Sequence, residues 1–250
     1  MQKILKADNR FSIYKSLLEL GDVNLPTELE SKNYFTNVFG IDFKGKEKTL
    51  ILKELYSRLQ EDSTYESGKI MGAMTQPGHE FARNVYSLYN GKNLGDAGLV
   101  KGSKKIEDEI IRIMGRLLGD HLIQGTIVSG GTEANIIAIL LAKQLKSGIK
   151  SPNIVVPDSA HYSFDKASLL MGFEIKRARL LEEDDYQVDM VHYESLIDNN
   201  TIALVGVAGT TGLGLVDPIE KMGKMAIENN LFFHVDGAFG GFILPFLECL

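Results

Sequence analysis

The chain has 250 residues, 44% of them hydrophobic and 24% charged, which is typical of a folded globular protein with a substantial core. The formal net charge of -6 argues against nucleic acid as the main partner, because no basic surface is available to neutralise phosphates. The single cysteine, Cys249, excludes an internal disulfide framework and is consistent with a reducing compartment.

The polar start of the chain, residues 1–10, has no apolar segment of the kind found in signal peptides. The longest apolar runs, near residues 136–142 and 202–208, are too short to span a bilayer. We therefore expect a cytoplasmic protein that binds neither membranes nor nucleic acid.

From about residue 13 to residue 90 the apolar residues have mostly helical spacing. The clearest helix face consists of Ile51, Leu52, Leu55 and Leu59. Turn-rich links, near Gly21 and over residues 40–45, separate the helical stretches. This part is predicted to be a helical N-terminal segment.

From about residue 94 the pattern changes to alternating helices and strands. The expected helices cover residues 105–118, 133–145, 161–171, 193–198 and 218–228. The expected strands cover residues 123–128, 153–156, 174–180, 202–207 and 231–235. This alternation predicts a mostly parallel sheet covered by helices on both faces, with ligands bound beyond the carboxyl ends of the strands.

Two glycines and a threonine follow the first of these strands. Gly130, Gly131 and Thr132 lead into a helix, where free backbone amides and a hydroxyl suit a phosphate group. The segment is neither a Walker loop nor a dinucleotide fingerprint. An ordinary turn with a helix cap, in which Glu133 is favourable in the first turn, is the alternative for this segment taken alone.

Two more strand ends carry polar side chains. His161 lies at a strand-to-helix turn, where its flat ring could stack on a flat cofactor, although a lone histidine is more often structural. Thr210 and Thr211 follow the strand over residues 202–207. Their hydroxyls could bind a phosphate or carboxylate, or could satisfy the backbone of their own turn.

Asp236 directly follows an apolar strand, where a buried carboxylate is costly without a partner. A metal is one candidate partner, because His234 would lie on the same strand face, but no third ligand is near in sequence. A cationic ring nitrogen is the other candidate, since the small residues Gly237 and Ala238 leave room for a flat ring. We favour the ring nitrogen and expect no metal.

Taken together, the strand ends supply a phosphate cradle, a flat ring, a hydroxyl pair and an anion for a ring nitrogen. This combination fits pyridoxal phosphate, whose pyridine must be protonated to act as an electron sink. A carboxylate beside the pyridinium favours the protonated form by Coulomb attraction. The four features are far more specific together than any one alone.

These segments resemble the group II pyridoxal-phosphate-dependent decarboxylases of the aspartate-aminotransferase fold, and most of all the archaeal L-tyrosine/L-aspartate decarboxylases. Four segments carry the resemblance: Ser129-Gly130-Gly131-Thr132-Glu133-Ala134-Asn135, Ala160-His161-Tyr162-Ser163-Phe164, Gly209-Thr210-Thr211 and His234-Val235-Asp236-Gly237-Ala238-Phe239-Gly240-Gly241. Segments 93–99 and 101–103 also look like that subfamily. The resemblance covers roughly residues 46–250.

The resemblance implies roles for individual residues. Gly131 and Thr132 would bind the cofactor phosphate, and Thr211 would lie near the cofactor or the substrate carboxylate. His161 would stack on the pyridine ring and help to control protonation of the substrate carbon. Asp236 would pair with the pyridine nitrogen. Ala238 would pack against the ring.

The resemblance also implies a domain organisation. Residues 94–250 would form a cofactor-binding large domain, and residues 1–93 a helical N-terminal segment whose first 45 residues match nothing in the family. Two departures matter. The family usually has alanine at the position of Gly237, and its covalent cofactor-binding lysine has no counterpart, because no lysine follows Lys224. We therefore expect a chain that lacks the C-terminal part of the family's fold.

The expected reaction is decarboxylation of an L-amino acid in a homodimer: L-aspartate to β-alanine, as in coenzyme A biosynthesis, or L-tyrosine to tyramine. The first is slightly favoured as the more general need. Arg83 and His79 are candidates near the substrate, with surface or capping roles as the alternative. Two other readings stay open: a carbon–carbon lyase of the sphingosine-phosphate-lyase type, and a non-catalytic fragment that lacks the covalent lysine.

Overall fold

The computed structural model describes residues 46–64, 67–70, 78–96, 98–120 and 122–247. The predicted extension, residues 1–45 with its turn-rich links, and Cys249 lie outside these ranges. The chain divides into two compact units, Met1–Thr64 and Tyr65–Leu250. The sequence predicts that the cofactor-binding domain begins at residue 94. The division into these two units does not test that boundary, which stays a prediction.

The described part of the first unit contains helix α4, Lys48–Leu59. This helix confirms the helical segment predicted from the spacing of its apolar residues. All four of those residues are exposed: Ile51, Leu52, Leu55 and Leu59.

The second unit begins its described part with helices α5, Glu80–Tyr89, and α6, Lys101–Leu117. His79 is the N-cap of α5, where its Nδ1 accepts a hydrogen bond of 3.2 Å from the backbone amide of Phe81. His79 therefore has the capping role that the sequence left as an alternative. Arg83 is exposed on the same helix.

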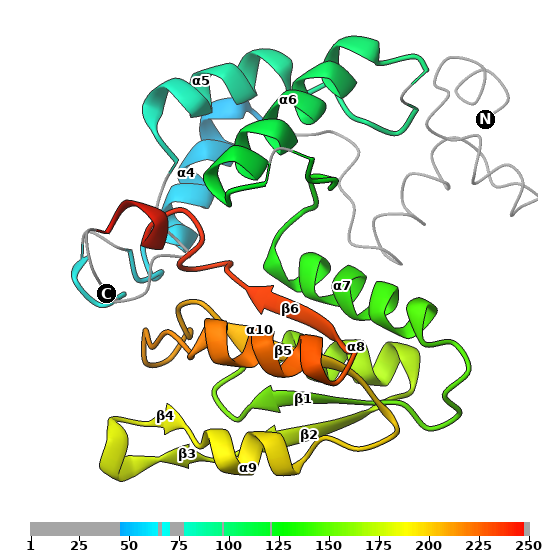
Figure 1. The fold of residues 1–250 in the computed structure, drawn as a ribbon. Helices are drawn as coiled ribbons and strands as arrows, with labels where there is room; N and C mark the ends of the chain where they lie inside the picture. The colour runs from blue at the N-terminus through cyan, green and yellow to red at the C-terminus, as the bar shows by residue number, and fades with distance from the viewer. Residues whose placement is uncertain (1–45, 65–66, 71–77, 97, 121, 248–250) are drawn as a thin grey trace, which may run out of the picture. The chain divides into compact units, whose positions relative to one another are not determined.

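The second unit contains a four-stranded parallel sheet, with helices α7 to α10 beside it (Figure 1). Its strands are β1, Asn153–Pro157, β2, Glu174–Ala178, β5, Thr201–Val207, and β6, Phe232–Asp236, in the order β2-β1-β5-β6. The intervening helices are α7, Gly131–Leu145, α8, Ser163–Met171, α9, Met190–Ser195, and α10, Ile219–Glu228. The predicted parallel α/β fold is confirmed.

Two apolar cores lie on the two faces of this sheet. Helices α7 and α8 pack on one face, where Ile154 and Val156 of β1 meet Ile139 and Phe164. Helices α9 and α10 pack on the other face, where Val155 lies in the second core. Because successive strand residues point to opposite faces, Ile154, Val155 and Val156 of β1 are all apolar and buried, which covers the strand on both sides.

The predicted strand over residues 123–128 is wrong. These residues form no strand, and no described strand pairs with them. The amide of Ile127 instead donates a hydrogen bond of 2.9 Å to Oε1 of Glu107 on α6, which also accepts one from the hydroxyl of Thr126. An apolar run becomes a strand only where a neighbouring strand supplies backbone partners, and here a side chain supplies them.

Several predicted boundaries move for local reasons. The strand predicted over residues 174–180 ends at Ala178, and the chain continues as β3, Leu180–Leu181, which pairs with β4, Gln187–Val188, in an antiparallel hairpin. The helix predicted over residues 193–198 occupies Met190–Ser195, because the Asp189 side chain caps its first amides.

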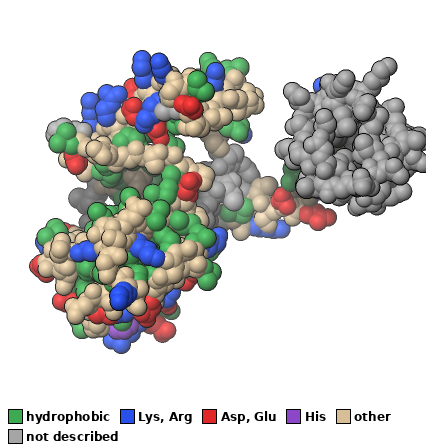
Figure 2. Space-filling model, turned by 90° about the vertical axis from the view of Figure 1, so that its right-hand side faces the viewer, with side chains coloured by type: hydrophobic (Ala, Val, Ile, Leu, Met, Phe, Trp, Pro, Cys, Tyr) green, Lys and Arg blue, Asp and Glu red, His purple; other side chains and the backbone are tan. Residues whose placement is uncertain are grey.

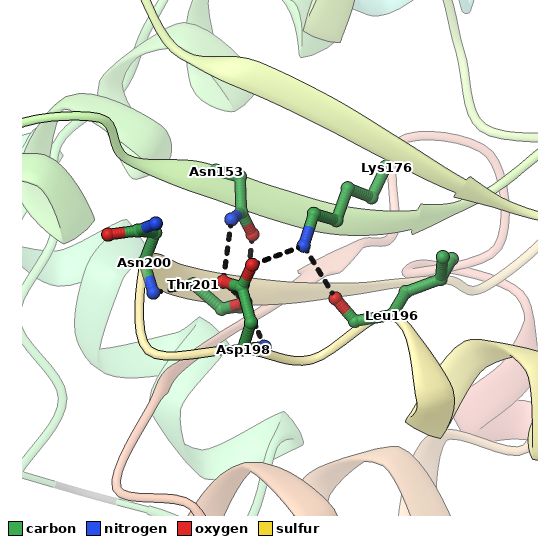
Figure 3. Close-up of polar contacts among 6 residues, drawn as sticks. All are labelled: Asn153, Lys176, Leu196, Asp198, Asn200 and Thr201. Atoms are coloured by element: carbon green, nitrogen blue, oxygen red, sulfur yellow. Dashed lines mark hydrogen bonds and ion pairs between the residues drawn. The ribbon is translucent and has the colours of Figure 1, made fainter.

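A polar cluster lies near the amino ends of β1, β2 and β5 (Figure 3). The residues that follow the carboxyl ends of these strands lie at the other end of the sheet. Asp198 accepts hydrogen bonds from Asn153 at 2.8 Å and from Lys176 at 2.7 Å. Lys176 also donates to the carbonyl of Leu196, and Thr201 donates to Asn153. The cluster thereby ties the α9–β5 link to β1 and β2.

No helix among the residues that the structure describes is long and apolar enough to cross a membrane.

Candidate active site

A cavity of about 200 Å³ lies at the carboxyl edge of the sheet. Its walls include all six residues predicted to bind the cofactor or take part in catalysis: Gly131, Thr132, His161, Thr211, Asp236 and Ala238. The other lining residues are Asn135, Tyr162, Val207, Gly209 and Phe239. Parallel pairing brings these segments together, because Val207 and Asp236 are partners in the β5–β6 register.

The start of α7 forms one wall of the cavity. Glu133 in its first turn folds back and accepts hydrogen bonds from the amide of Ser129 at 2.7 Å and from its hydroxyl at 2.6 Å, which lower the pKa of the Glu133 carboxyl. The N-cap, Gly130, has no side chain to satisfy the first amides of the helix. These amides and the Thr132 hydroxyl can therefore receive an anion.

Glycine is required at position 131 by close packing. A Cβ atom built on Gly131 would lie 2.9 Å from the Cβ atom of Ala238, which follows β6. Two parts of the cavity that are more than 100 residues apart in sequence thus meet at this point. At Gly237, by contrast, an added Cβ would be 3.5 Å from its nearest neighbour, an ordinary contact, so the alanine usual in the family would fit.

His161 lies in the turn between β1 and α8. Its Nδ1 accepts a hydrogen bond of 3.2 Å from the backbone amide of Ser163. In the neutral ring the proton is therefore on Nε2, which becomes a donor. The ring of Tyr162 lies next to it, with centroids 4.2 Å apart and planes tilted by 42°.

The structure separates the two hydroxyls of the threonine pair. Thr210 is buried, and its hydroxyl accepts a hydrogen bond of 3.0 Å from the amide of Leu215, within its own turn. Thr211 lines the cavity. The hydroxyl of Thr210 therefore satisfies the backbone of its own turn. Of the two threonines, Thr211 is the one placed to contact a ligand.

Asp236 ends β6 and is 7% exposed. One of its carboxylate oxygens accepts a hydrogen bond of 2.9 Å from the amide nitrogen of Asn135, and the other accepts one of 3.1 Å from the backbone of Ala238. Both donors are neutral. Among the described residues no lysine or arginine forms an ion pair with this carboxylate.

His234 and Asp236 lie on the same face of β6, as the alternation predicted. His234 does not face Asp236 directly, because the side chain of Asn135 lies between them, with its oxygen 2.8 Å from Nε2 of His234. Burial lowers the pKa of His234 and favours its neutral form. Within the described ranges, no three histidine, cysteine, aspartate or glutamate side chains are grouped to hold a metal.

Sequence reasoning missed Asn135. It stands in the quoted motif, four residues after Gly131, and a residue one helical turn after a phosphate-binding start lies on the same helix face. That spacing could have identified it as a cavity residue. Its partners on β6, about 100 positions away, could not be found from local sequence.

The arrangement fits pyridoxal phosphate in two respects. The buried Asp236 carboxylate lacks a cationic partner among the described residues, and a ring nitrogen that carries a proton would supply one. The close approach of Gly131 to Ala238 places the free amides of α7 next to that carboxylate. Fold and cavity together are those of an α/β domain suited to a phosphorylated ring cofactor.

Comparison with known proteins identifies the family. The model of the pyridoxal-dependent decarboxylase conserved domain matches residues 105–250. The chain therefore belongs to the pyridoxal-dependent decarboxylase family, whose cofactor is pyridoxal phosphate, and the predicted resemblance is confirmed.

Individual relatives support this assignment. The L-aspartate decarboxylase of Thermococcus kodakarensis is 45% identical over 207 residues, which cover 83% of this chain and 53% of the relative. A protein named probable L-tyrosine/L-aspartate decarboxylase from Methanothermobacter thermautotrophicus is 44% identical over 185 residues, which cover 74% of this chain and 50% of the relative. The chain thus spans about half the length of these curated relatives.

Among solved structures, the sphingosine-1-phosphate lyase of Burkholderia pseudomallei matches with a TM-score of 0.70 at 30% identity. The match covers 91% of this chain and 52% of the lyase. It confirms the fold of the pyridoxal-phosphate-dependent enzymes.

Proposed function

We propose that the protein is a pyridoxal-phosphate-dependent decarboxylase of an L-amino acid. The observation that carries this proposal is the buried Asp236 carboxylate, which faces the cavity with only neutral hydrogen-bond donors around it. Such a carboxylate stabilises a protonated ring nitrogen. When bound, the cofactor supplies an electron sink for the electron pair left on the substrate carbon.

The residues of the chain divide the remaining tasks. The first turn of α7, with Gly131 and Thr132, binds the phosphate group and fixes the position of the ring. Asp236 holds the proton at the ring nitrogen. His161 and Ala238 line the cavity and would pack against the ring, and the neutral imidazole of His161 carries its proton on Nε2. Thr211 contacts the cofactor or the substrate carboxylate.

For the substrate we propose L-aspartate, with L-tyrosine as the second candidate. The names of the T. kodakarensis and M. thermautotrophicus relatives, at 45% and 44% identity, support these two amino acids. The 30% identity to a sphingosine-1-phosphate lyase favours the carbon–carbon lyase reading less. A decarboxylase that forms β-alanine would serve coenzyme A biosynthesis.

Product analysis of the full-length protein tests the substrate. Incubation with L-aspartate is expected to release carbon dioxide and β-alanine, and incubation with L-tyrosine to release tyramine at a lower rate. Absence of carbon dioxide release from every amino acid, together with cleavage of a phosphorylated sphingoid base, would reject decarboxylation in favour of the lyase.

Replacement of Asp236 by alanine tests the site. The Asp236→Ala variant is expected to lose about 100-fold or more in turnover, because the ring nitrogen loses its counter-charge. Asp217→Asn is the matched control, since Asp217 is also a buried carboxylate, 5% exposed, but accepts a backbone hydrogen bond from Val207 and does not line the cavity. Turnover of Asp236→Ala near that of the control would contradict the role of Asp236.

We further propose that the protein is a cytoplasmic homodimer. The resemblance to the group II decarboxylases supports this assembly. Light scattering of the full-length protein gives its oligomeric state directly, and a monomer that is fully active would reject the dimer.

A further inference from the structure

The network around Asn135 assigns a role to a residue outside the predicted site. Asn135 is 2% exposed and lies on α7, one turn after the phosphate cradle. Its amide nitrogen donates to Asp236 at 2.9 Å and to the hydroxyl of Ser163 at 2.9 Å, and its oxygen is 2.8 Å from Nε2 of His234. Every polar atom of the side chain thus has a partner.

These partners determine the orientation of the amide. Both hydrogens on the nitrogen are used by Asp236 and Ser163, so the oxygen must accept, and His234 must carry its proton on Nε2. Burial lowers the pKa of His234 and so favours its neutral form. The ring of Phe164 packs edge-on against the ring of His234, with the two ring centroids 6.0 Å apart. If the Asn135 amide were turned by 180°, its nitrogen would face the Nε2 proton of His234 and its oxygen would face the Asp236 carboxylate. Two donors and two acceptors would then oppose each other, so this orientation is unfavourable.

We propose that Asn135 is the positioning residue for Asp236, and that neutral His234 holds Asn135 in the orientation that donates to this carboxylate. The proposal rests on the proposed placement of the cofactor ring next to Asp236. A donor at 2.9 Å stabilises the carboxylate in its anionic form and restricts its rotation at the place where Asp236 lines the cavity. Because α7 also carries the phosphate cradle, one helix sets the distance between the two ends of the cofactor.

The test uses two probes with the full-length apoprotein: pyridoxal phosphate labelled with ¹⁵N in the ring, and 4'-deoxypyridoxine 5'-phosphate, which cannot bond covalently to a lysine. The ¹⁵N chemical shift reports directly whether the ring nitrogen is protonated. Wild-type protein is expected to bind both probes, and the ring of the labelled probe is expected to be protonated. Failure of the wild type to do so would reject the proposed cofactor placement itself.

The variants Asn135→Leu and Asn135→Ala test Asn135. Leucine keeps the branching of the side chain at Cγ, alanine removes the side chain beyond Cβ, and neither has a hydrogen-bond donor. Both raise the proton affinity of Asp236, so the ring ¹⁵N signal is expected to move toward the unprotonated position at neutral pH. Affinity for 4'-deoxypyridoxine 5'-phosphate is expected to weaken by about tenfold or more. The two variants give independent readings if one of them fails to fold.

Asn153 provides a matched control. It is 1% exposed, and its amide nitrogen donates to Asp198 at 2.8 Å, but it lies at the opposite edge of the sheet (Figure 3). Asn153→Leu and Asn153→Ala are expected to lower stability and leave the ring ¹⁵N signal and the affinity unchanged. A protonated ring with wild-type affinity in folded Asn135 variants would overturn the proposal, and so would an equal shift in the Asn153 variants.

Discussion

Asp236 and Asn135 show how differently two residues of one site are marked in sequence. Asp236 could be predicted because a carboxylate directly after an apolar strand needs an explanation. The helical spacing from Gly131 could have placed Asn135 at the cavity, but not its contact with Asp236, because an asparagine in a helix has no local signature of its partners. Its role depends on hydrogen bonds to residues 28 and about 100 positions away, which only the packing of α7 against α8 and β6 creates.

His161 shows that a hydrogen bond can sharpen a prediction made from residue type. The sequence indicated a flat ring at a strand end. The bond from Ser163 to Nδ1 adds that the second nitrogen, Nε2, is the donor of the neutral ring. Stacking and proton transfer thus become separable functions of one side chain.

Substitution of His161 tests this separation. His161→Phe keeps a flat ring, so apoprotein affinity for the cofactor is expected to change little, whereas turnover is expected to fall about 100-fold because the Nε2 proton is lost. His161→Ala is expected to weaken cofactor affinity by about 3- to 10-fold as well. Fluorescence titration and steady-state rates measure both quantities. Wild-type turnover of the phenylalanine variant would show that the imidazole only stacks.

Among the elements, most strands and helices of the second unit could be predicted from periodicity, and the exception is instructive. Residues 123–128 have the apolar content of a strand but no described strand beside them. Their polar contacts come from Glu107, whose pKa falls to about 2 chiefly because it accepts from the Ile127 amide. Strand pairing is a property of two segments, so one segment cannot predict it alone.

The cluster around Asp198 provides an element-scale stability test (Figure 3). Its bonds from Lys176 and Asn153 lower the pKa of Asp198. Asp198→Ala is expected to reduce the free energy of unfolding by about 1 to 2 kcal/mol at neutral pH, because the buried Asn153 amide loses its acceptor and the partly exposed ion pair adds little.

The pH dependence of this difference has a definite sign. A carboxyl whose pKa is lowered by folding stabilises the protein above its unfolded pKa, about 3.9, and loses that contribution as the pH falls. The gap between wild type and Asp198→Ala should therefore narrow in acid. Urea unfolding at several pH values measures it. A gap that is constant from neutral pH into the acid range would contradict the contribution of the ionised carboxylate.

For the whole molecule, the apolar side chains that remain at the surface are informative. Figure 2 shows hydrophobic side chains interspersed with charged ones on the described surface. On α6 the apolar residues at helical spacing include Ile106, Ile110 and Ile113, which are 60%, 39% and 55% exposed. The buried positions of this helix are instead Glu107 and Gly115. An apolar stripe of this kind favours association.

We therefore expect the 250-residue chain to bind a hydrophobic dye and to self-associate. Replacing Ile106, Ile110 and Ile113 by glutamine should reduce dye fluorescence and apparent mass. Each replacement should change the free energy of unfolding by less than about 0.5 kcal/mol, because the side chains are exposed. Val191→Gln with Ile227→Gln, two exposed sites on different helices, is the control. Equal effects of the two sets would exclude a specific role for α6.

The sequence by itself determined the fold class, the cofactor and the segments at the strand ends, because strand alternation, glycines before a helix and a carboxylate after a strand are local features with local physical causes. Only the tertiary structure decided the strand order β2-β1-β5-β6, the contact between Gly131 and Ala238, and the position of Asn135 between His234 and Asp236. These depend on which distant segments pack together, and the burial that drives such packing belongs to the whole chain.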